Sequence, residues 1–335
     1  MYFKSKINPC LFIAEVGSAH EGSYKNALKL ISSAVQTNAD VIKLQIYTAE
    51  NMVSKKYDPK RFQHFKKLEL NNYQYATLLK KIRKGNKITC ASVWDHKLIK
   101  YFNKFIDIFK IGSGDIHNFQ IIKKIIKTKK PVIISTGLCN LKDIKLLYNF
   151  IKKTDYNYIK ERKVALLHCN TSYPTPSEDA NLGNIKTLKK FKLPTGYSDH
   201  CIGSEVLFCS FLKGAQIIEK HFSNNTKLKT FRDHQISLDK KGVNQFLEKI
   251  NDANKYLNKK EKNLTQSEIK QKNLLSFRRS IYAKKKIKKG QKFTEQNIIC
   301  LRPYIKSSSS INFFKLIKNK NAKKNYNQGD IISSI

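Results

Sequence analysis

Short apolar runs alternate with longer segments of helical spacing over residues 1–257 of the chain. The runs are rich in β-branched residues, which is typical of buried strands in a parallel sheet. There are eight of them, at residues 11–16, 41–47, 87–94, 108–112, 132–135, 164–169, 195–198 and 216–222. Eight strand-and-helix units within about 250 residues favour an α/β fold of the closed (β/α)8 TIM-barrel type over an open doubly wound sheet. No G-x-G-x-x-G sequence follows the first run, which further weakens a dinucleotide-binding fold.

One connecting segment illustrates the helical spacing. Residues 23–38 carry apolar side chains three and four residues apart, at Ala27, Leu30, Ile31, Ala34 and Val35. Such a stripe covers one face of a helix, and Ser23 can cap its N-terminus. We therefore expect this helix to pack against the core.

The barrel pattern ends near Leu257, and a different organisation follows. Residues 258–275 are polar and lysine-rich and predict a linker that is in part helical. Residues 276–335 predict a small β-rich domain, which would be of marginal stability alone. Its expected elements are strands at 279–283, 292–293 and 298–301, a helical turn at 315–318, and turns at Lys289-Gly290 and Gln328-Gly329-Asp330.

Polar residues close each of the eight predicted strands. In a (β/α)8 barrel the carboxyl ends of the strands meet at one face, where the active site lies. We therefore expect residues that are far apart in sequence to form one site. They are Glu15, Lys43, Gln45, Ser92, Lys110, Ser113, Asp115, Ser135, Thr136, His168, Asn170, Tyr173, Ser198, Asp199, His200, Glu219 and His221.

Two of these residues, Lys43 and Lys110, are flanked by apolar residues inside predicted strands. A lysine in such a place must either extend its ammonium group to water or meet an anion. Serine and threonine hydroxyls surround both lysines, and nearby glycines let backbone N–H groups approach a ligand. This combination suits a phosphate or a phosphorylated carboxylate.

His200 and His221 close neighbouring strands, which would bring both imidazoles within reach of one divalent ion. Two nitrogen ligands without a third protein ligand would leave coordination positions for substrate oxygens and water. A hydrogen-bonded structural role for either histidine is the alternative. His168 has no metal-like spacing to the other two, and we expect it to be packed in the core or to support the site from behind.

The chain of 335 residues has 65 Lys or Arg against 25 Asp or Glu, a formal net charge of +40. Such a charge suggests nucleic acid or an anionic membrane as a partner. However, only seven of the cations are Arg, the residue best suited to reading bases. An excess of Lys, Asn and Ile is also what A/T-rich codons produce. We therefore expect no specific nucleic-acid partner, and only a salt-sensitive attraction of small anions to the surface.

The remaining composition is that of a globular protein, with 40% hydrophobic residues. No apolar run approaches the roughly 18 residues of a membrane span, and residues 1–9 lack the apolar segment of a signal peptide. The seven cysteines are scattered and contain no C-x-x-C pair, which indicates reduced thiols. We expect a cytoplasmic protein without a membrane partner.

Together these motifs resemble the sialic acid synthases (N-acetylneuraminate, legionaminate and pseudaminate synthases). These enzymes condense phosphoenolpyruvate with an N-acylated amino sugar to a nine-carbon 2-keto acid and phosphate. The resemblance covers nearly the whole chain and includes the antifreeze-like (SAF, β-clip) domain at the C-terminus. The similar segments are Ala14-Glu15-Val16-Gly17 with His20 and Gly22, Lys43-Leu44-Gln45, residues 110–115, Ser135-Thr136-Gly137, residues 168–174, 197–200 and 219–222, Arg279-Ser280 and Leu301-Arg302-Pro303.

The resemblance implies a role for each site residue. Glu15 would lie beside the reacting carbons, and His200 and His221 would bind Mn²⁺ or Mg²⁺ and take part in catalysis. The phosphoenolpyruvate ligands would be Lys43, Lys110, Ser113, Ser135 and Ser198, with Ser92 where a threonine is usual. The acceptor sugar would meet Gln45, Asp115, Tyr173, Asp233 and Arg302.

The resemblance also implies a domain-swapped homodimer, in which the antifreeze-like domain covers the partner's barrel and Arg302 contacts the sugar's N-acyl group. The alternative for Arg302 is a pairing on the surface of its own small domain. Departures from the family pattern lie on the acceptor side: Ala19 replaces a frequent Asn, Asp233 comes one residue late, and Tyr304 replaces a glycine. The reaction type is therefore better supported than the identity of the sugar.

Two other functions stay open from the sequence. One is a related phosphoenolpyruvate-dependent synthase that acts on a phosphorylated sugar, although such relatives generally consist of the barrel alone. The other is a basic nucleic-acid-binding protein on a barrel scaffold. That protein would be retained on duplex DNA at about 0.2 M salt, whereas binding by charge alone would be lost.

Overall fold

The computed structural model describes residues 2–257 and 261–333. The chain divides into two compact units, Met1–Leu257 and Asn258–Ile335, and each is described by itself. The predicted linker, 258–275, begins on residues 258–260, which lie outside the described residues.

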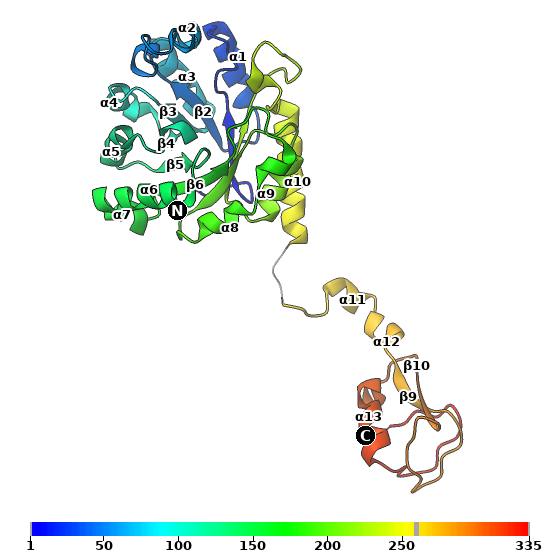
Figure 1. Cartoon of the computed structure of the whole chain (residues 1–335). Coiled ribbons are helices and arrows are strands. Elements are labelled where there is room, and N and C mark those ends of the chain that lie inside the picture. Colours follow the sequence, from blue (N-terminus) through cyan, green and yellow to red (C-terminus); the bar gives the residue numbers. More distant parts are fainter. Residues whose placement is uncertain (1, 258–260, 334–335) are drawn as a thin grey trace. The chain divides into compact units, whose positions relative to one another are not determined.

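The first unit is a closed barrel of eight parallel strands in sequential order, as the apolar runs predict (Figure 1). Every predicted strand is present, and the ends differ from the expected ones by at most one residue. For example, β7 continues one residue beyond the predicted end, to Asp199, because it pairs with β8 as far as Lys220. The strands are β1 (Leu11–Glu15), β2 (Val41–Ile46), β3 (Ile88–Val93), β4 (Ile108–Ile111), β5 (Val132–Ser135), β6 (Val164–Cys169), β7 (Thr195–Asp199) and β8 (Ile217–His221).

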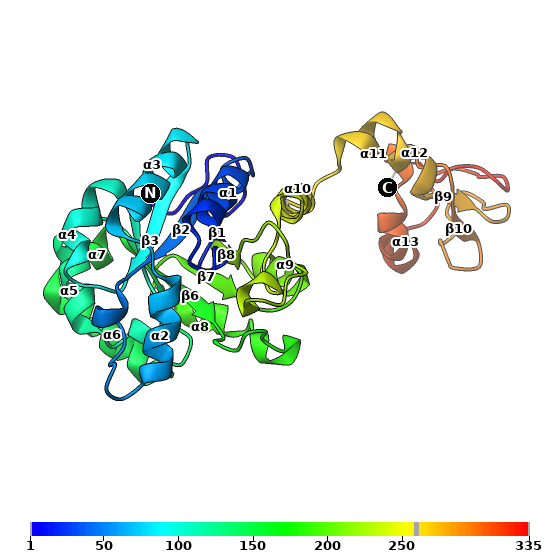
Figure 2. The same cartoon turned by 90° about the horizontal axis from the view of Figure 1, so that it is seen from above.

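Helices connect successive strands and surround the barrel (Figures 1 and 2). Outward-facing strand residues such as Phe12, Ile42 and Phe109 pack against the apolar faces of these helices and form the main core. The helices are α1 (Tyr24–Ala34), α2 (Pro59–Leu68), α3 (Asn72–Lys84), α4 (Leu98–Phe102), α5 (Phe119–Lys127), α6 (Leu141–Thr154), α7 (Tyr156–Lys160), α8 (Asn184–Lys189), α9 (Glu205–Leu212) and α10 (Lys240–Tyr256).

Helix α1 begins as the sequence predicts but ends early. The Ser23 side chain accepts a hydrogen bond from the backbone N–H of Asn26 and so caps the N-terminus. The helix was expected to reach Asn38, but it ends at Ala34. There the Thr37 backbone N–H and hydroxyl both donate to the Ala34 carbonyl, at 3.1 and 2.7 Å, which turns the chain towards β2.

Side chains that point into the barrel change from apolar to polar towards the carboxyl ends of the strands. In β1, Leu11 and Ile13 belong to the inner apolar cluster, and Glu15 follows two residues later on the same side. In β4, Ile108 belongs to that cluster and Lys110 follows it. One end of the barrel interior is therefore filled by apolar side chains, and the other presents the polar ones.

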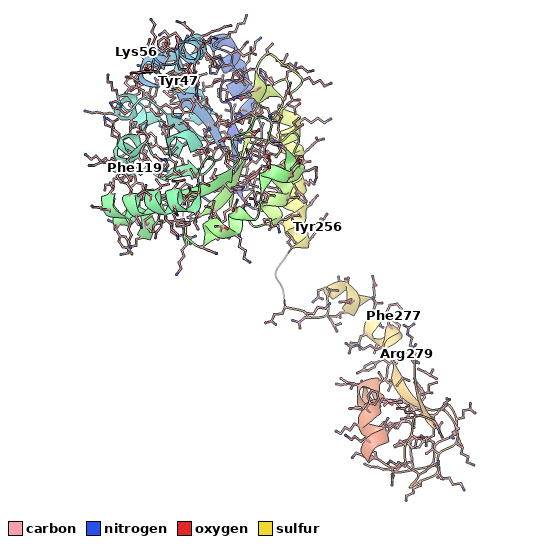
Figure 3. All side chains as sticks on the ribbon, viewed as in Figure 1. Tyr47, Lys56, Phe119, Tyr256, Phe277 and Arg279 are labelled. Atoms are coloured by element: carbon pink, nitrogen blue, oxygen red, sulfur yellow. The ribbon has the colours of Figure 1, made fainter. Side chains whose placement is uncertain are left out.

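The second unit contains two short antiparallel strands, β9 (Ser280–Ala283) and β10 (Ile298–Leu301), and helices α11 (Gln266–Lys270), α12 (Asn273–Phe277) and α13 (Phe313–Asn319). It has a small core of its own, which includes Ile281, Phe293, Leu316 and Tyr326. Arg279, labelled in Figure 3, donates from Nη1 to the Cys300 carbonyl at 2.8 Å.

Two predictions for this unit are wrong: one predicted strand is absent, and the predicted helical turn is shorter than the helix that forms. Residues 292–293 form no strand but a single bridge between Lys292 and Asn321. Helix α13 exceeds the predicted turn at 315–318 chiefly at its N-terminal side, where Phe313 packs against the small core together with Leu316 and Ile317. Gly290 and Gly329 occupy the expected turns with φ of +83° and +86°.

Among residues 2–257 and 261–333, no helix combines the length and the apolar character that crossing a membrane would require.

Candidate active site

A cavity of about 710 Å³ opens at the carboxyl ends of the barrel strands. Most of the predicted site residues line it, and Glu15 lies behind it, in contact with Lys43. Arg302 belongs to the other unit. The predicted residues that line the cavity are Lys43, Gln45, Ser92, Lys110, Ser113, Asp115, Ser135, Tyr173, Ser198, His200, Glu219, His221 and Asp233.

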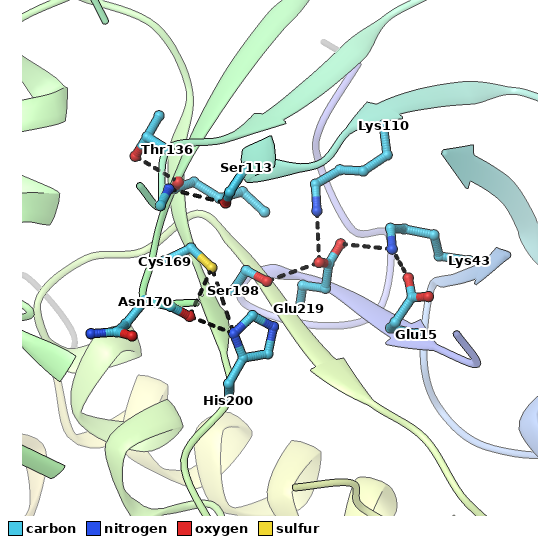
Figure 4. A network of polar contacts seen from close by, with 12 residues as sticks. Glu15, Lys43, Lys110, Ser113, Thr136, Cys169, Asn170, Ser198, His200 and Glu219 are labelled. Carbon is cyan, nitrogen blue, oxygen red and sulfur yellow. Dashed lines mark hydrogen bonds and ion pairs between the residues drawn. The ribbon is translucent and has the colours of Figure 1, made fainter. Parts of the chain in front are cut away.

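Two lysines and two glutamates form a buried network at the inner end of the cavity (Figure 4). Lys110 Nζ lies 2.7 Å from Glu219 Oε1, and Ser198 Oγ donates to the same oxygen at 2.9 Å. Lys43 pairs with Glu15 and lies 4.0 Å from Glu219 Oε2. None of the four charged side chains is more than 6% exposed. The sequence indicates that each lysine, if it does not reach water, needs an anionic partner. In the structure, that partner is at least in part a carboxylate of the chain itself, Glu15 for Lys43 and Glu219 for Lys110.

Burial and charge act on these groups in opposite directions. Burial lowers the pKa of Lys43 to about 8, although the neighbouring Glu219 charge favours its protonated form. For Glu219, burial would raise the pKa, but the charges of Lys110 and Lys43 outweigh it and hold the pKa below its usual range. Glu219 is therefore an anion at neutral pH.

Hydroxyl groups lie around the lysines at the same end of the cavity. The Ser113 hydroxyl accepts a hydrogen bond from the Gly137 backbone N–H at 3.0 Å. A Cβ at position 137 would lie 2.8 Å from Ser113 Oγ, so the glycine allows this close approach. The Ser135 hydroxyl is buried and has no hydrogen-bond partner within the described part of the chain. An unpaired buried hydroxyl beside two lysines suits a ligand with anionic oxygens.

His200 and His221 face each other, with ring centroids 5.4 Å apart. His200 Nδ1 donates to the Asn170 carbonyl at 2.6 Å, which leaves the lone pair on Nε2. Burial lowers the pKa of His200 to about 4, and burial together with His200 holds that of His221 well below its usual value. Both imidazoles are therefore neutral, the form that ligates metals.

The two histidines fit a divalent ion with open coordination positions. His221 Nδ1 is buried without a hydrogen-bond partner in residues 2–257 and 261–333. Those residues contain no cluster of three or more His, Cys, Asp or Glu side chains arranged around a metal position. Two imidazole nitrogens as the protein's donors would leave room for substrate oxygens and water on a bound ion.

Another wall of the cavity is formed by residues after β6 and β8. Asp233 Oδ2 lies 3.6 Å from His221 Nδ1, and burial raises the pKa of Asp233 to about 6. The centroid of the Tyr173 ring lies 4.1 Å from that of His200, and the Arg232 guanidinium lies over the Tyr173 ring, 4.3 Å from its centroid. The side chains of Glu15, His221 and Asp233 all approach Gly17 closely. A Cβ at this position would lie 3.2 to 3.3 Å from each of them.

The comparison with protein families gives a match of residues 30–262 to the NeuB family. The chain belongs to the NeuB family. It is 34% identical to the N,N'-diacetyllegionaminic acid synthase of Campylobacter jejuni, with 96% of this chain and 98% of that protein covered. It is 28% identical to the N-acetylneuraminate-9-phosphate synthase of Mus musculus, with 86% and 81% covered.

A solved structure agrees with this assignment. The N-acetylneuraminic acid synthetase of Leptospira borgpetersenii, solved in complex with citrate, has a TM-score of 0.70 and 29% identity, with 79% of this chain and 91% of that one covered. The NeuB-family chain described here is therefore an enzyme, a transferase of the sialic-acid synthase type, as its motifs predicted.

Some residues of this NeuB-family site carry no signal in the strand pattern. Arg61 and His64 from α2, and Phe231 and Arg232 from the loop after β8, line the outer part of the cavity. Loop and helix residues follow no strand periodicity, so only the composition hints at them, since arginine is rare in this chain. Glu219 is different. The sequence places it among the strand-end residues, but nothing in the sequence pattern indicates that it contacts both lysines.

Several predicted residues do not line the cavity. Asp199 pairs with Lys220 at 2.5 Å, the Thr136 hydroxyl donates to the Leu167 carbonyl at 3.0 Å, and Asn170 contributes only its carbonyl, to His200. His168 Nε2 is hydrogen-bonded to the Ala180 carbonyl at 2.8 Å, and its ring packs near Tyr197, which is the packed position we expected. Arg302 is exposed in the second unit, where its Nε donates to the Phe277 carbonyl at 3.0 Å. Its role towards the sugar stays a prediction. All seven cysteines are free thiols.

Proposed function

We propose that this NeuB-family enzyme condenses phosphoenolpyruvate with an N-acylated amino sugar to a nine-carbon 2-keto sugar acid and phosphate. The acceptor would be N-acetylmannosamine or a diacetamido-trideoxyhexose. One observation carries the proposal: a single cavity has two buried lysines ringed by hydroxyls at one end and two neutral imidazoles beside them. The first group suits a small phosphorylated acid, and the second suits a metal-assisted carbonyl reaction.

Phosphoenolpyruvate would be held at the inner end. Lys43 and Lys110 would meet its anionic groups, and Ser92, Ser113, Ser135 and Ser198 would donate hydrogen bonds to its oxygens. The Gly137 backbone N–H already points at Ser113, which fixes that hydroxyl. Much of the rate would come from holding the two reactants in register in one cavity.

His200 and His221 would hold Mn²⁺ or Mg²⁺, and the ion would supply Lewis-acid polarisation of the acceptor's aldehyde oxygen. Neutral imidazoles are needed for this, and burial provides them. Gln45, Asp115, Tyr173 and Asp233 would orient the open-chain sugar so that its aldehyde carbon faces phosphoenolpyruvate.

Glu15 would act at the reacting carbons. C3 of phosphoenolpyruvate forms the new bond to the aldehyde carbon, and positive character develops at C2. The Glu15 carboxylate would stabilise that charge or help a water molecule to add there. The resulting hemiketal phosphate loses phosphate by cleavage of the C–O bond. The ammonium groups of the lysines would stabilise the negative charge of the leaving phosphate.

The C-terminal unit would be an antifreeze-like domain that completes the site of a second subunit. Its similarity to the family at Arg279-Ser280 and Leu301-Arg302-Pro303 supports this. In a domain-swapped homodimer, Arg302 would reach the N-acyl group of the sugar bound to the partner. We propose that this dimer works in the cytoplasm and binds neither membranes nor specific nucleic acids.

A phosphorylated amino sugar is the second candidate acceptor. The observation that favours it is the pair of arginines, Arg61 and Arg232, at the outer part of the cavity in a chain with only seven. Guanidinium groups bind phosphate through two parallel hydrogen bonds, which lysines do not. A relative that covers most of this chain is an N-acetylneuraminate-9-phosphate synthase.

A substrate panel tests both candidates. Phosphoenolpyruvate and Mn²⁺ are combined with N-acetylmannosamine, its 6-phosphate or diacetamido-trideoxyhexoses, and phosphate release and product mass are measured. We expect release with at least one acceptor, and only when a divalent cation is present. Absence of release with all of them would contradict the proposed function, and release with the 6-phosphate alone would select the second candidate.

A further inference from the structure

Glu219 occupies a central place in the cavity that the proposed reaction does not use. It is in the middle of β8, where its register partners are Ser198 on β7 and Ile13 on β1. Its side chain therefore points into the barrel, as does that of His221 two residues later. Lys220 between them points outward, where it pairs with Asp199 at 2.5 Å.

The Glu219 carboxylate is bound where an anionic ligand would be expected to bind. Its Oε1 receives Lys110 at 2.7 Å and Ser198 at 2.9 Å, and its Oε2 lies 4.0 Å from Lys43 (Figure 4). Among the described residues, it is the only carboxylate within 4.0 Å of Lys110. Oε2 is buried and accepts no hydrogen bond there. Glu219 Oε1 is thus paired with Lys110 and Ser198, whereas Oε2 is a buried polar atom that no described residue hydrogen-bonds.

The charges of the network cancel. Lys43 and Lys110 are balanced by Glu15 and Glu219, although the chain as a whole carries +40. An entering phosphate therefore does not meet two free ammonium groups. It must share or displace the Lys110–Glu219 contact and tolerate a buried carboxylate nearby, and both effects weaken its binding in a site of low dielectric.

The two phosphate-bearing molecules of the proposed reaction respond differently to this weakening. Phosphoenolpyruvate carries a carboxylate as well as a phosphate, so contacts with the second group offset the cost. Inorganic phosphate has no second group. A site without Glu219 would bind the product tightly, and tight binding of product slows turnover without lowering the barrier of the chemical step.

We propose that Glu219 is an internal counter-anion, which competes with phosphate for Lys110 and so keeps the product phosphate weakly bound. This inference rests on the proposed function, because it takes the lysine end of the cavity as the phosphate site. Glu219 is a positioning residue here: it acts through Lys110 and need not touch the reacting carbons.

The test is a calorimetric titration of the full chain with inorganic phosphate at fixed ionic strength, in wild type and in Glu219→Gln. The substitution keeps the shape and removes the charge, so phosphate should bind roughly tenfold more tightly or better. Inhibition of turnover by phosphate should strengthen by a similar factor. The matched control is Glu205→Gln, which removes the same charge from an exposed pair with Lys249 and should leave phosphate affinity unchanged.

Glu219→Asp provides a second variant in case the Gln variant does not fold. It keeps the charge but withdraws the carboxylate from Lys110 by one methylene, so it should bind phosphate more tightly than wild type by a smaller factor. Unchanged, weaker or undetectable phosphate binding in a folded variant would overturn the inference, as would an equal gain in the Glu205→Gln control.

The outcomes separate this inference from the proposed function. Tighter phosphate binding in Glu219→Gln, together with no turnover of phosphoenolpyruvate by the wild-type enzyme, would keep the inference and contradict the proposed function. Turnover of phosphoenolpyruvate in wild type, with unchanged phosphate affinity in Glu219→Gln, would keep the function and overturn the inference.

Discussion

The two lysines of the barrel interior differ in their electrostatic surroundings. Lys43 lies between two carboxylates, Glu15 and Glu219, whereas Lys110 has Glu219 as its ion-pair partner. Burial nevertheless brings the pKa of Lys43 down to about 8. A residue that the sequence marks only as a lysine in a strand therefore titrates close to the physiological range, because desolvation opposes its charged form.

This titration predicts a pH limit on substrate binding. As the pH rises through about 8, Lys43 loses its proton and with it the charge that would hold phosphoenolpyruvate. The value of kcat/KM for phosphoenolpyruvate should then fall, approaching tenfold per pH unit. Steady-state rates measured from neutral pH upward at saturating acceptor check this. A profile that stays flat well above pH 8 would show that Lys43 is not needed as a cation.

The histidine pair predicts a second effect at the residue scale. His200→Ala removes one of two nitrogen ligands, so activity should fall by at least roughly 100-fold and lose its dependence on Mn²⁺. Phosphate release measured against Mn²⁺ concentration tests this. His117→Ala is the control, because His117 is an exposed histidine that pairs with Asp143 outside the cavity. Full activity in His200→Ala would remove this residue from the metal site.

At the scale of single elements, local signals place the starts of helices and the middles of strands well. The Ser23 cap and the bounds of β5 and β6 follow directly from side-chain type and periodicity. The early end of α1 and the missing strand at Lys292 do not. Helix α1 ends where Thr37 donates to the Ala34 carbonyl, a turn that competes locally with a continued helix. The strand at Lys292 depends on pairing with Asn321, which is distant in sequence, and periodicity does not encode that pairing.

A glycine in β7 shows how tightly the barrel strands pack. A Cβ at Gly196 would lie 1.9 Å from the carbonyl oxygen of Ile217, its register partner on β8. Gly196→Ala should therefore destabilise the barrel by about 1–3 kcal/mol or more, because backbone must move to admit the methyl group.

Urea unfolding followed by tryptophan fluorescence measures this change, since the only tryptophan of the chain, Trp94, is in the barrel unit. Gly114→Ala is the matched control for stability, as a Cβ there has no atom within 4 Å. Equal unfolding midpoints for the two variants would show that the strands can separate without cost.

At the scale of the whole molecule, the predicted site residues fall in two units. The barrel unit holds the cavity, and the unit Asn258–Ile335 holds Arg302. A domain-swapped homodimer would complete each site with an arginine from the other subunit. Symmetric dimers make this arrangement possible without any additional chain.

Mixing two inactive variants tests the swap. Lys110→Met disables the barrel site, and Arg302→Ala disables the contribution of the C-terminal unit. In a swapped dimer, random mixing should restore about a quarter of the sites, because one site in each heterodimer then receives intact parts from both chains. Activity is measured after the variants are co-expressed or exchanged. No recovery in proven heterodimers would show that each chain completes its own site.

The alternation of apolar runs and helical segments was enough to predict the barrel, since periodicity is a local property that one chain displays directly. The strand-end rule then collected most of the cavity residues, from Lys43 to His221. The pairing of Lys110 with Glu219 is different. These residues are 109 positions apart, and their contact depends on how a closed sheet brings β4 and β8 to face each other across its interior. Local pattern showed which side chains enter the barrel, but folding selected their partners, because charge and burial act through space and not along the chain.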